Sequence, residues 1–341
     1  MPQGETKYQS ELFEETVLTR TRPDLLRRFT STPHAADLRL MQRTVRVETN
    51  EERILDVSRQ FFQAHQHGKV GTPQFCWRIV CESDSQVQST AVPLSAFSDL
   101  GVRYVNIGQR SFLSVDLESR KAVAFLSDRF LADGPRFRHR PPLDILFSMT
   151  ASSLGLTALS GACVGVKDRA VLIFGPPNSG KTTASYLAAK AGMEFHADQV
   201  VFLDTNRNML RAWGDPFPAV FRPETMEFLP ELQKSSCPST YADISFYYFD
   251  KAPLQPRWAR PVTPVCSLFL ERGLAGETQL RRISSQEALS RLRDCSLLNE
   301  DARFDKQITT ALSMLSAKPI YSLRYARDPK VASTVIGKML S

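Results

Sequence analysis

Residues 169–192 read RAVLIFGPPNSGKTTASYLAAKAG and carry the strongest signal for a fold class in the chain. It opens with RAVLIF, an apolar run with the length and composition of a buried strand. It closes with TTASYLAAK, which is rich in residues that favour a helix, and a glycine follows where a helix would end. Between the two lies GPPNSGKT, which matches the pattern GxxxxGK[ST] in full. A strand, such a loop and a helix in this order predict the phosphate-binding loop (P-loop) of an α/β domain.

The loop residues have separate physical tasks in binding a nucleoside triphosphate. Glycines allow the backbone to curl, so that successive N–H groups and the start of the helix face the phosphates. Lys181 supplies an ammonium for the β- and γ-phosphates, and the hydroxyl of Thr182 is a ligand for Mg²⁺. The expected binding residues are Gly175, Asn178, Ser179, Gly180, Lys181, Thr182 and Thr183. The sequence therefore predicts ATP and Mg²⁺ as cofactors.

A second acid for Mg²⁺ is expected downstream, and the segment FHADQVVFLD (195–204) offers Asp198 and Asp204. An apolar run that ends in an acid favours Asp204. However, the chain between Thr182 and Asp204 is barely long enough for one helix and one strand. A strand that returns antiparallel to the first would also place its start, and not its end, beside the phosphates. Asp198 lies at that start, and we therefore predict that Asp198 binds the metal.

Residues 159–204, LSGACVGVKDRAVLIFGPPNSGKTTASYLAAKAGMEFHADQVVFLD, resemble the HPr kinase/phosphorylase family, and in particular the HPr-kinase-related proteins. Weaker similarities are VCSLFLERG (265–273) and IYSLRYARDP (320–329), so the resemblance covers about residues 140–340. It implies an α/β P-loop domain with a mixed sheet, related in fold to phosphoenolpyruvate carboxykinase. It also implies ATP-dependent phosphorylation of a serine or threonine hydroxyl on a protein or peptide.

The resemblance assigns roles to individual residues. Lys181 and Thr182 keep their P-loop roles. Asp198 matches the first acid of the family's Asp-Asp pair, which serves Mg²⁺ binding and activation of the attacking hydroxyl, so Asp198 and Lys181 are the expected catalytic residues. Two positions depart from the family. The second acid is replaced by Gln199, whose amide takes no proton, and a histidine of the preceding strand is replaced by Ser160.

Four further residues are candidates for the same site. His196 is two positions from Asp198 on an alternating strand, which predicts that both side chains share one face; the alternative is a structural histidine. Arg222 and Arg272 are candidates for binding the γ-phosphate, because a guanidinium offers a planar fork of donors; the alternative is that both are ordinary surface arginines. Glu271 is a candidate for a further metal ligand or base.

Composition divides the chain into three parts. Residues 1–35 are polar, lack periodicity and are expected to form an extension. Residues 36–130 contain repeated strand-like runs, which predict a small α+β module with mostly antiparallel strands that presents a substrate or partner. Residues 131–341 form the expected P-loop domain. The basic run RFRHR (136–140) near its start either binds an acidic partner or is a solvated linker.

Local signals predict several boundaries. The later part of residues 38–48 alternates in the way of a half-buried strand, and Thr49 with Glu52 fit a capping box before a helix. In the third part, the helix starts expected from capping are Ser284 with Glu287 and Asp328 with Pro329, and a helix is expected over 301–317.

Bulk properties limit the possible partners. A formal charge of +7 favours acidic partners such as nucleotides. Because Lys and Arg are spread along the chain, with no zinc-finger spacing and no aromatic RNA-binding signature, no nucleic-acid partner is expected. The six cysteines show no metal-ligand spacing and are expected to be reduced. Without a signal peptide or an apolar run of about 20 residues, a cytoplasmic protein with no membrane segment is predicted. The sequence leaves open whether the protein forms a homo-oligomer.

Three hypotheses for the function follow. The first is an ATP-dependent protein or peptide kinase. The second is a sensor that binds ATP without transferring phosphate, in which Gln199 and Ser160 mark lost chemistry and nucleotide binding controls a partner. The third is a small-molecule kinase or a carboxykinase-like enzyme, which is less favoured because the sequence offers no dedicated anion site beyond the P-loop.

Overall fold

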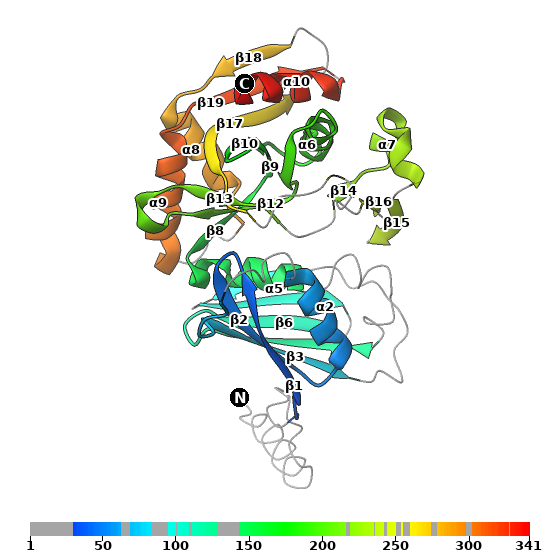
Figure 1. The fold of residues 1–341 in the computed structure, drawn as a ribbon, viewed down its shortest axis with the longest axis vertical. Helices are drawn as coiled ribbons and strands as arrows, with labels where there is room; N and C mark the ends of the chain where they lie inside the picture. The colour runs from blue at the N-terminus through cyan, green and yellow to red at the C-terminus, as the bar shows by residue number, and fades with distance from the viewer. Residues whose placement is uncertain are drawn as a thin grey trace, which may run out of the picture.

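The structure is a computed structural model. It describes the backbone of residues 30–62, 69–82, 95–99, 101–108, 111–128, 143–215, 219–234, 236–241, 244–249, 254, 260–273, 278–297, 302–326 and 328–341. The basic run at 136–140 and nearly all of the predicted extension lie outside these residues. The elements form a mixed α/β architecture with mixed sheets, arranged as a lower and an upper part in Figure 1.

The lower part is a seven-stranded sheet in the order β1-β2-β3-β7-β6-β5-β4. Its strands are β1 His34–Leu40, β2 Arg43–Thr49, β3 Phe75–Glu82, β4 Ser95–Asp99, β5 Val102–Gly108, β6 Ser111–Asp116 and β7 Lys121–Ser127. The pairings β2–β3 and β3–β7 are parallel and the other four are antiparallel. The strands alternate buried and half-buried residues, as expected for a sheet with one face on a core.

The half-buried strand expected in the later part of 38–48 is present as β2, and the chain before it adds β1, so that the two strands form a hairpin. Met41 and Gln42 connect β1 to β2 and both have positive φ, at 47° and 64°. Such a two-residue turn is usually signalled by Asn or Gly, and this sequence has neither. The side chain of Met41 is fully buried, and Nη1 of Arg43 donates to the Met41 carbonyl over 2.7 Å. Burial and this bond hold a backbone conformation that the turn residues do not favour by themselves.

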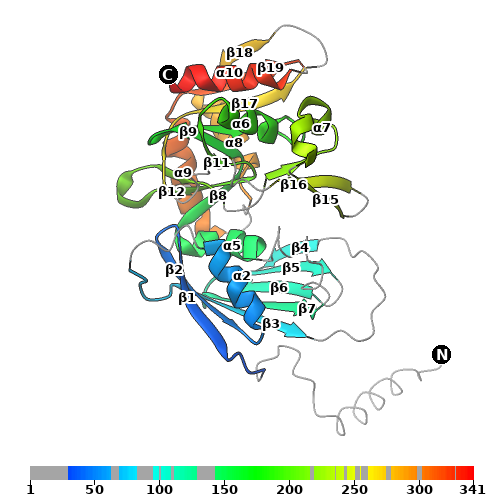
Figure 2. The ribbon, with the colours of Figure 1, turned by 45° about the vertical axis from the view of Figure 1, so that its right-hand side comes forward.

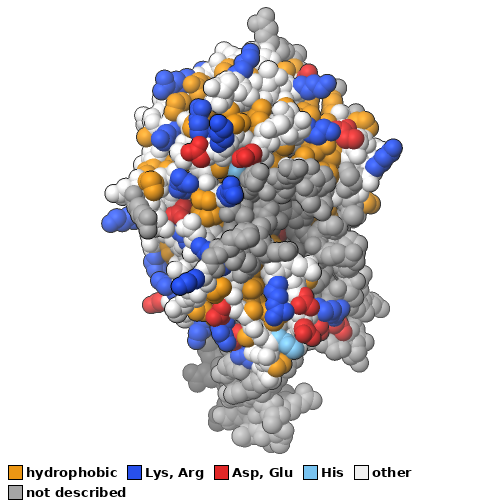
Figure 3. Space-filling view, viewed as in Figure 1, with side chains coloured by type: hydrophobic (Ala, Val, Ile, Leu, Met, Phe, Trp, Pro, Cys, Tyr) orange, Lys and Arg blue, Asp and Glu red, His pale blue; other side chains and the backbone are white. Residues whose placement is uncertain are grey.

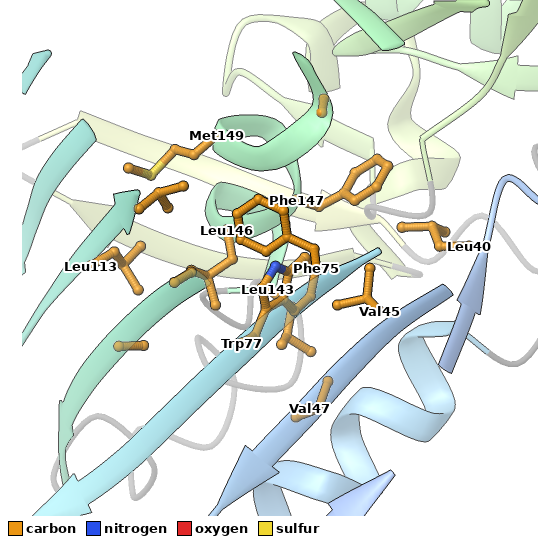
Figure 4. Packing of buried hydrophobic residues seen from close by; sticks show 14 of the residues in the cluster. Leu40, Val45, Val47, Phe75, Trp77, Leu113, Leu143, Leu146, Phe147 and Met149 are labelled. Atoms are coloured by element: carbon orange, nitrogen blue, oxygen red, sulfur yellow. The ribbon is translucent and has the colours of Figure 1, made fainter. Parts of the chain in front are cut away.

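Two helices, α2 Glu52–Phe62 and α5 Leu143–Thr150, join the core of this sheet. Apolar residues of α5 and the sheet point toward one another in Figure 4; those labelled there are Leu40, Val45, Val47, Phe75, Trp77, Leu113, Leu143, Leu146, Phe147 and Met149. Large buried side chains of this kind contribute about 2–3 kcal/mol each. The predicted capping box is wrong: because α2 begins at Glu52, Thr49 lies outside its first turn, and its hydroxyl accepts from the Glu51 N–H instead.

The upper part is built on a six-stranded mixed sheet, β11-β9-β10-β17-β19-β18. Its strands are β9 Ala162–Val166, β10 Arg169–Phe174, β11 Glu194–Ala197, β17 Thr263–Arg272, β18 Gln279–Arg282 and β19 Ile320–Tyr325. Strands β10, β17 and β19 run parallel, and the remaining pairings are antiparallel. The strand expected at 169–174 and the mixed sheet are thus confirmed.

Helices cover both faces of this sheet, which explains why β10 is apolar and buried after its first residue, Arg169. The helices are α6 Lys181–Lys190, α8 Ser285–Asp294, α9 Asp305–Ser316 and α10 Pro329–Leu340. Val171 and Ile173 pack with α6 and α10, whereas Leu172 and Phe174 pack with α8 and α9. The predicted caps are present: Ser284 Oγ accepts from the Glu287 N–H, and the Asp328 carboxylate accepts from the Lys330 N–H.

Two three-stranded sheets complete the upper part. One, β13-β12-β8, comprises β8 Leu156–Ser160, β12 Val200–Asp204 and β13 Arg211–Trp213. The other, β14-β16-β15, comprises β14 Ala219–Phe221, β15 Ser236–Tyr241 and β16 Ile244–Phe249, with the short helix α7 Thr225–Phe228 beside it. The rings of Phe147 in α5 and Phe202 in β12 are 4.7 Å apart between centroids, so the lower and upper parts share a packed contact.

The distribution of charged side chains on the surface and the state of the cysteines agree with what the sequence suggested. On the face in Figure 3, Lys and Arg side chains are scattered among acidic and apolar ones instead of forming one patch. Five cysteines with described side chains, Cys76, Cys81, Cys163, Cys266 and Cys295, are free thiols. Within the described ranges, no helix is long and apolar enough to cross a membrane.

Candidate functional site

The loop between β10 and α6 is strongly curled. Gly175, Asn178 and Gly180 have φ of 145°, 63° and 94°, conformations that favour glycine or asparagine. A Cβ on Gly175 would lie 2.6 Å from the Leu270 carbonyl oxygen, and a Cβ on Gly180 would lie 2.4 Å from Oη of Tyr325. Both positions therefore require glycine, for space as well as for φ.

The loop is fixed from the adjacent strand and from within. Oη of Tyr325, at the end of β19, donates to the Ser179 carbonyl over 2.8 Å. The Ser179 N–H donates to the Pro176 carbonyl over 3.2 Å, so this group closes a turn in the loop. The side chain of Ser179 is buried beneath the loop, and its Oγ has no hydrogen-bond partner among the described residues. Ser179 thus supports the loop from below instead of facing outward.

Helix α6 begins at Lys181 directly after Gly180, and no side chain in the described part of the chain caps it. The first N–H groups of a helix have no partner within the helix, and they carry its positive dipole end. Lys181 folds back over the loop, where its Nζ donates to the carbonyls of Gly175 at 2.7 Å and Pro176 at 3.0 Å. Burial lowers the pKa of the Lys181 ammonium, while the charge of nearby Asp198 acts in the opposite direction.

A cleft of about 1120 Å³ opens beside the loop, between the upper and lower parts. In Figures 1 and 2, α6 and strands β14, β15 and β16 lie above α5, and Figure 2 also shows β5 below them. The predicted loop residues that line the cleft are Gly175, Asn178, Gly180, Lys181, Thr182 and Thr183. Asp198, Gln199 and Ser160 line it as well. The structure therefore brings together the loop, the predicted metal-binding acid and both positions that depart from the family.

Asp198 reaches the cleft by a different route from the one expected. The segment expected as one antiparallel strand is two strands in different sheets, β11 and β12, with Asp198 and Gln199 at the break. Because β11 and β10 both run antiparallel to β9, they run in the same direction and end at the same edge. Asp198 therefore follows the end of β11 and immediately precedes β12. Asp198 is 1% exposed as a residue, and its Oδ2 accepts a hydrogen bond from the Val220 N–H over 3.4 Å.

Asp204, the rejected alternative, ends β12 far from the loop. Its Oδ2 lies 2.8 Å from Nη1 of Arg43, and both side chains are over 90% buried. Burial by itself would raise the pKa of Asp204, but the hydrogen bond and charge of Arg43, together with hydrogen bonds from Asn206 and Trp213, outweigh it, and the pKa is lowered. Arg43 also donates to the Leu154 carbonyl over 3.0 Å. Asp204 therefore ties the lower part to the upper part.

Asp215 was not identified from the sequence. It is fully buried, and its Oδ2 accepts from three consecutive backbone N–H groups, those of Asp198 at 3.2 Å, Gln199 at 3.3 Å and Val200 at 3.2 Å. The only sequence signal is the dipeptide Asp215-Pro216, which marks a turn. Its partners depend on the pairing of β12 with β13, which no local pattern reveals.

The other candidates separate into two groups. Arg222 and Arg272 line the cleft, and Nη2 of Arg272 would lie 3.4 Å from a Cβ on Gly180. Glu271 is directed elsewhere: its Oε1 accepts from Arg291 at 2.6 Å and from Ser322 at 2.7 Å. The hydrogen bond from Ser322 and then that from Arg291 lower the pKa of Glu271. Glu271 thus belongs to an ion-pair network and is not among the cleft-lining residues.

Of the two alternatives for His196, the structure favours the structural histidine, because His196 is not among the residues that line the cleft. The pairing of β11 with β9 shifts register between Phe195 and Ala197, which breaks the alternation of side chains. The imidazole of His196 is fully buried over Gly165, where its Nε2 would lie 3.1 Å from a Cβ on that glycine. It has the position of a structural histidine.

The residues present fit a phosphate-bearing ligand with its metal. No side chain among the described residues caps the start of α6, and Lys181 folds over the loop. Thr182 and Asp198 carry side-chain oxygens, the ligand type that Mg²⁺ prefers, and both line the same cleft. Mg²⁺ prefers oxygen ligands and is typically bound by one or two protein groups together with phosphates and waters. Two protein oxygens are therefore an ordinary set for this ion.

No family model matches the chain, and no curated protein matches it. Among solved structures, the chain is similar to the Hpr(Ser) kinase/phosphatase from Coxiella burnetii. The identity is 14%, the match covers 53% of this chain and 88% of that chain, and the TM-score is 0.27. A similarity of this size does not carry a function, so the function is argued from the cleft.

Proposed function

We propose that the protein is a Mg²⁺-dependent ATP phosphotransferase that acts on a serine or threonine hydroxyl of a protein or peptide. The observation that carries the proposal is the convergence of Lys181, Thr182 and Asp198 on one cleft beside a curled loop that opens into α6. Phosphoryl transfer needs little covalent chemistry from the protein and depends on positioning and on charge neutralisation. This arrangement supplies both.

Each residue has a task in the proposed reaction. The amides at the start of α6 and the Lys181 ammonium bind the phosphates, and Arg222 and Arg272 stand at the cleft to balance further negative charge. Thr182 and Asp198 hold Mg²⁺, which supplies charge that screens the phosphates from the incoming oxygen. Asp198 accepts the proton of the acceptor hydroxyl as its oxygen bonds to the γ-phosphorus and the bond from that phosphorus to ADP breaks.

A nucleotide sensor without catalysis is the second candidate, and one observation favours it. Gln199 lines the cleft beside Asp198, and an amide neither takes a proton nor binds Mg²⁺ strongly. In this alternative, the protein binds ATP with an affinity that Lys181 supports, and no phosphate is transferred. Because the cleft has walls from both parts of the chain, nucleotide binding would then change the contact between them.

Transfer of labelled γ-phosphate from Mg-ATP into proteins of a host extract tests the proposal. We expect a labelled band with the wild-type protein and none with Lys181→Ala. Lys190→Ala is the matched control, since Lys190 lies on the same helix with half of its side chain exposed. Its ammonium forms a 3.8 Å ion pair with Glu231 and lies 6.0 Å from the centre of the Tyr186 ring, and it does not line the cleft. A band with all three proteins would contradict the proposal. No band with wild type, together with nucleotide binding that Lys181→Ala abolishes, would favour the sensor, whereas a labelled metabolite would favour a small-molecule kinase.

A further inference from the structure

The backbone between β11 and β12 has donors that no strand can satisfy. The chain leaves one sheet at Ala197 and enters another at Val200, so the N–H groups of Asp198 and Gln199 lie between two ladders. Buried N–H groups need an acceptor, because leaving one unpaired costs about 1–3 kcal/mol. Here the acceptor is a single carboxylate oxygen, Oδ2 of Asp215, which also receives the Val200 N–H.

The register of the β12–β13 hairpin brings Asp215 to this place. Phe202 pairs with Trp213 in an antiparallel ladder, so two further residues along the chain bring Asp215 opposite Val200. On the other side of the break, the Gln199 carbonyl accepts from the Gly161 N–H over 3.0 Å. The short segment that carries Asp198 is thus held on both sides by bonds to its backbone.

We propose that Asp215 is a positioning residue for the cleft: its charge fixes the Asp198–Val200 turn and thereby aims the Asp198 carboxylate at the metal. Asp215 is fully buried and is not among the residues that line the cleft, so it acts through Asp198 and touches no substrate. Three successive N–H groups that converge on one anion form a compact anion-binding backbone conformation, and hydrogen bonds to a charged oxygen are about twice as strong as neutral ones.

This inference rests on the proposed function, because it assigns Asp198 to the metal. It also explains how one acid can suffice beside Gln199. In this chain the second carboxylate of the site stands at Asp215, behind the backbone, where it orients the surviving acid without binding the metal. The outer partners of metal ligands typically change metal affinity or activity by about 10–100-fold when they are replaced.

The test compares Asp215→Asn with Asp204→Asn. Both acids are buried beside β12, at its two ends, and only Asp215 contacts the Asp198 turn. Binding of a fluorescent ATP analogue is measured with Mg²⁺ and with chelator. For Asp215→Asn we expect the Kd with Mg²⁺ to rise about tenfold, and the Kd with chelator to stay within about twofold of wild type. Asp204→Asn should leave the Kd with Mg²⁺ unchanged. Equal Kd values with Mg²⁺ for wild type and Asp215→Asn would overturn the proposal.

Hydrogen exchange gives a readout that needs no ligand. The amides of Asp198, Gln199 and Val200 should exchange at least about tenfold faster in Asp215→Asn than in wild type, while those of α10 stay unchanged. Unaltered exchange at these three amides would overturn the proposal. Should Asp215→Asn not fold, Asp215→Glu takes its place. It keeps the charge but moves the carboxylate by one methylene, and we expect intermediate Mg²⁺-dependent binding; values equal to wild type in both measurements would count against the role.

A double-mutant cycle separates positioning from a general structural role. If Asp215 acts through Asp198, the Kd with Mg²⁺ of Asp198→Asn/Asp215→Asn should equal that of Asp198→Asn within about twofold. Losses that multiply would overturn the inference and leave the proposed function intact. A wild-type protein that binds no nucleotide would instead remove the proposed function, and the inference with it.

Discussion

The two ends of strand β12 carry the same kind of residue in opposite roles. Asp198 precedes the strand at the cleft, and Asp204 ends it at the contact between the two parts of the chain. Both side chains are buried. The difference lies in the partners: Asp204 faces the guanidinium of Arg43 at 2.8 Å, whereas Asp198 receives a backbone N–H from Val220 and faces the cleft that Lys181 also lines.

The comparison shows that burial by itself does not define the function of an acid. A carboxylate paired with an arginine is neutralised and fixed, and it has little capacity left for a ligand. Asp198, by contrast, lines the cleft, where a bound cation can reach its carboxylate. The structure therefore separates a structural acid from a candidate metal ligand on one strand, and substitutions at either end test this separation.

The largest expected effect is a loss of phosphate transfer when Asp198, at the cleft end of β12, is replaced. Asp198→Asn keeps the size of the side chain but removes its charge and its ability to take a proton. We expect phosphate transfer to fall by at least about 100-fold, the range typical of a lost proton acceptor. Asp204→Asn should retain transfer within about threefold when assayed below its unfolding temperature. The measurement is the initial rate of label incorporation; equal rates for Asp198→Asn and wild type would remove Asp198 from the catalytic role.

The second-largest expected effect is a loss of folding stability when Asp204, at the other end of β12, is replaced. Asp204→Asn leaves Arg43 as a buried charge without its acid, and breaking such a pair costs about 3–5 kcal/mol. We expect the free energy of unfolding in urea to fall by about that amount, with a much smaller change for Asp198→Asn. The double variant Arg43→Met/Asp204→Leu removes both charges, but also the Arg43 donors to the Met41 and Leu154 carbonyls, and should recover part of the loss. A drop in Asp198→Asn as large as that in Asp204→Asn would break the distinction between the two ends.

The pH dependence of folding stability tests the ion pair of Asp204 with Arg43 at the far end of β12. The pKa of Asp204 is lowered in the folded protein, because Arg43 and the hydrogen bonds from Asn206 and Trp213 together outweigh the effect of burial. A carboxyl with a depressed folded pKa stabilises the fold above its unfolded value of about 3.9, and this stabilisation is lost as the pH falls through the folded value. We expect unfolding in urea between pH 5 and pH 2 to show a steeper loss of stability in wild type than in Arg43→Met/Asp204→Leu (about 1 kcal/mol or more). Parallel pH profiles would contradict the assigned ion pair.

The sequence predicted the elements whose signals are local. An apolar run and a stretch rich in Ala and Leu predicted β10 and α6, and the caps at Ser284 and Asp328 predicted two helix starts. The choice of Asp198 over Asp204 agrees with their locations, but the supporting argument assumed one strand where the chain switches sheets.

What the sequence did not reveal depends on contacts between distant residues. The Met41-Gln42 turn is held by burial and by Arg43, and Asp215 finds its partners through a hairpin register. The side-chain direction of His196 depends on a register shift in a neighbouring pair of strands. None of these causes leaves a pattern in a short window of sequence.

The smallest expected effect concerns the bond that supports the loop at the cleft end. Tyr325→Phe removes the hydroxyl that donates to the Ser179 carbonyl at 2.8 Å and keeps the ring in place. One neutral hydrogen bond contributes about 1 kcal/mol, so we expect a several-fold rise in the Kd for nucleotide with a stability loss of about that size. Because this bond acts on the phosphate side of the cleft, the rise should be the same with Mg²⁺ and with chelator, unlike that of Asp198→Asn, which should appear only with Mg²⁺. A Tyr325→Phe defect confined to Mg²⁺ would mean that the loop and the acid act as one unit. The difference between the two ends of β12 would then extend to the whole cleft instead of belonging to Asp198 by itself.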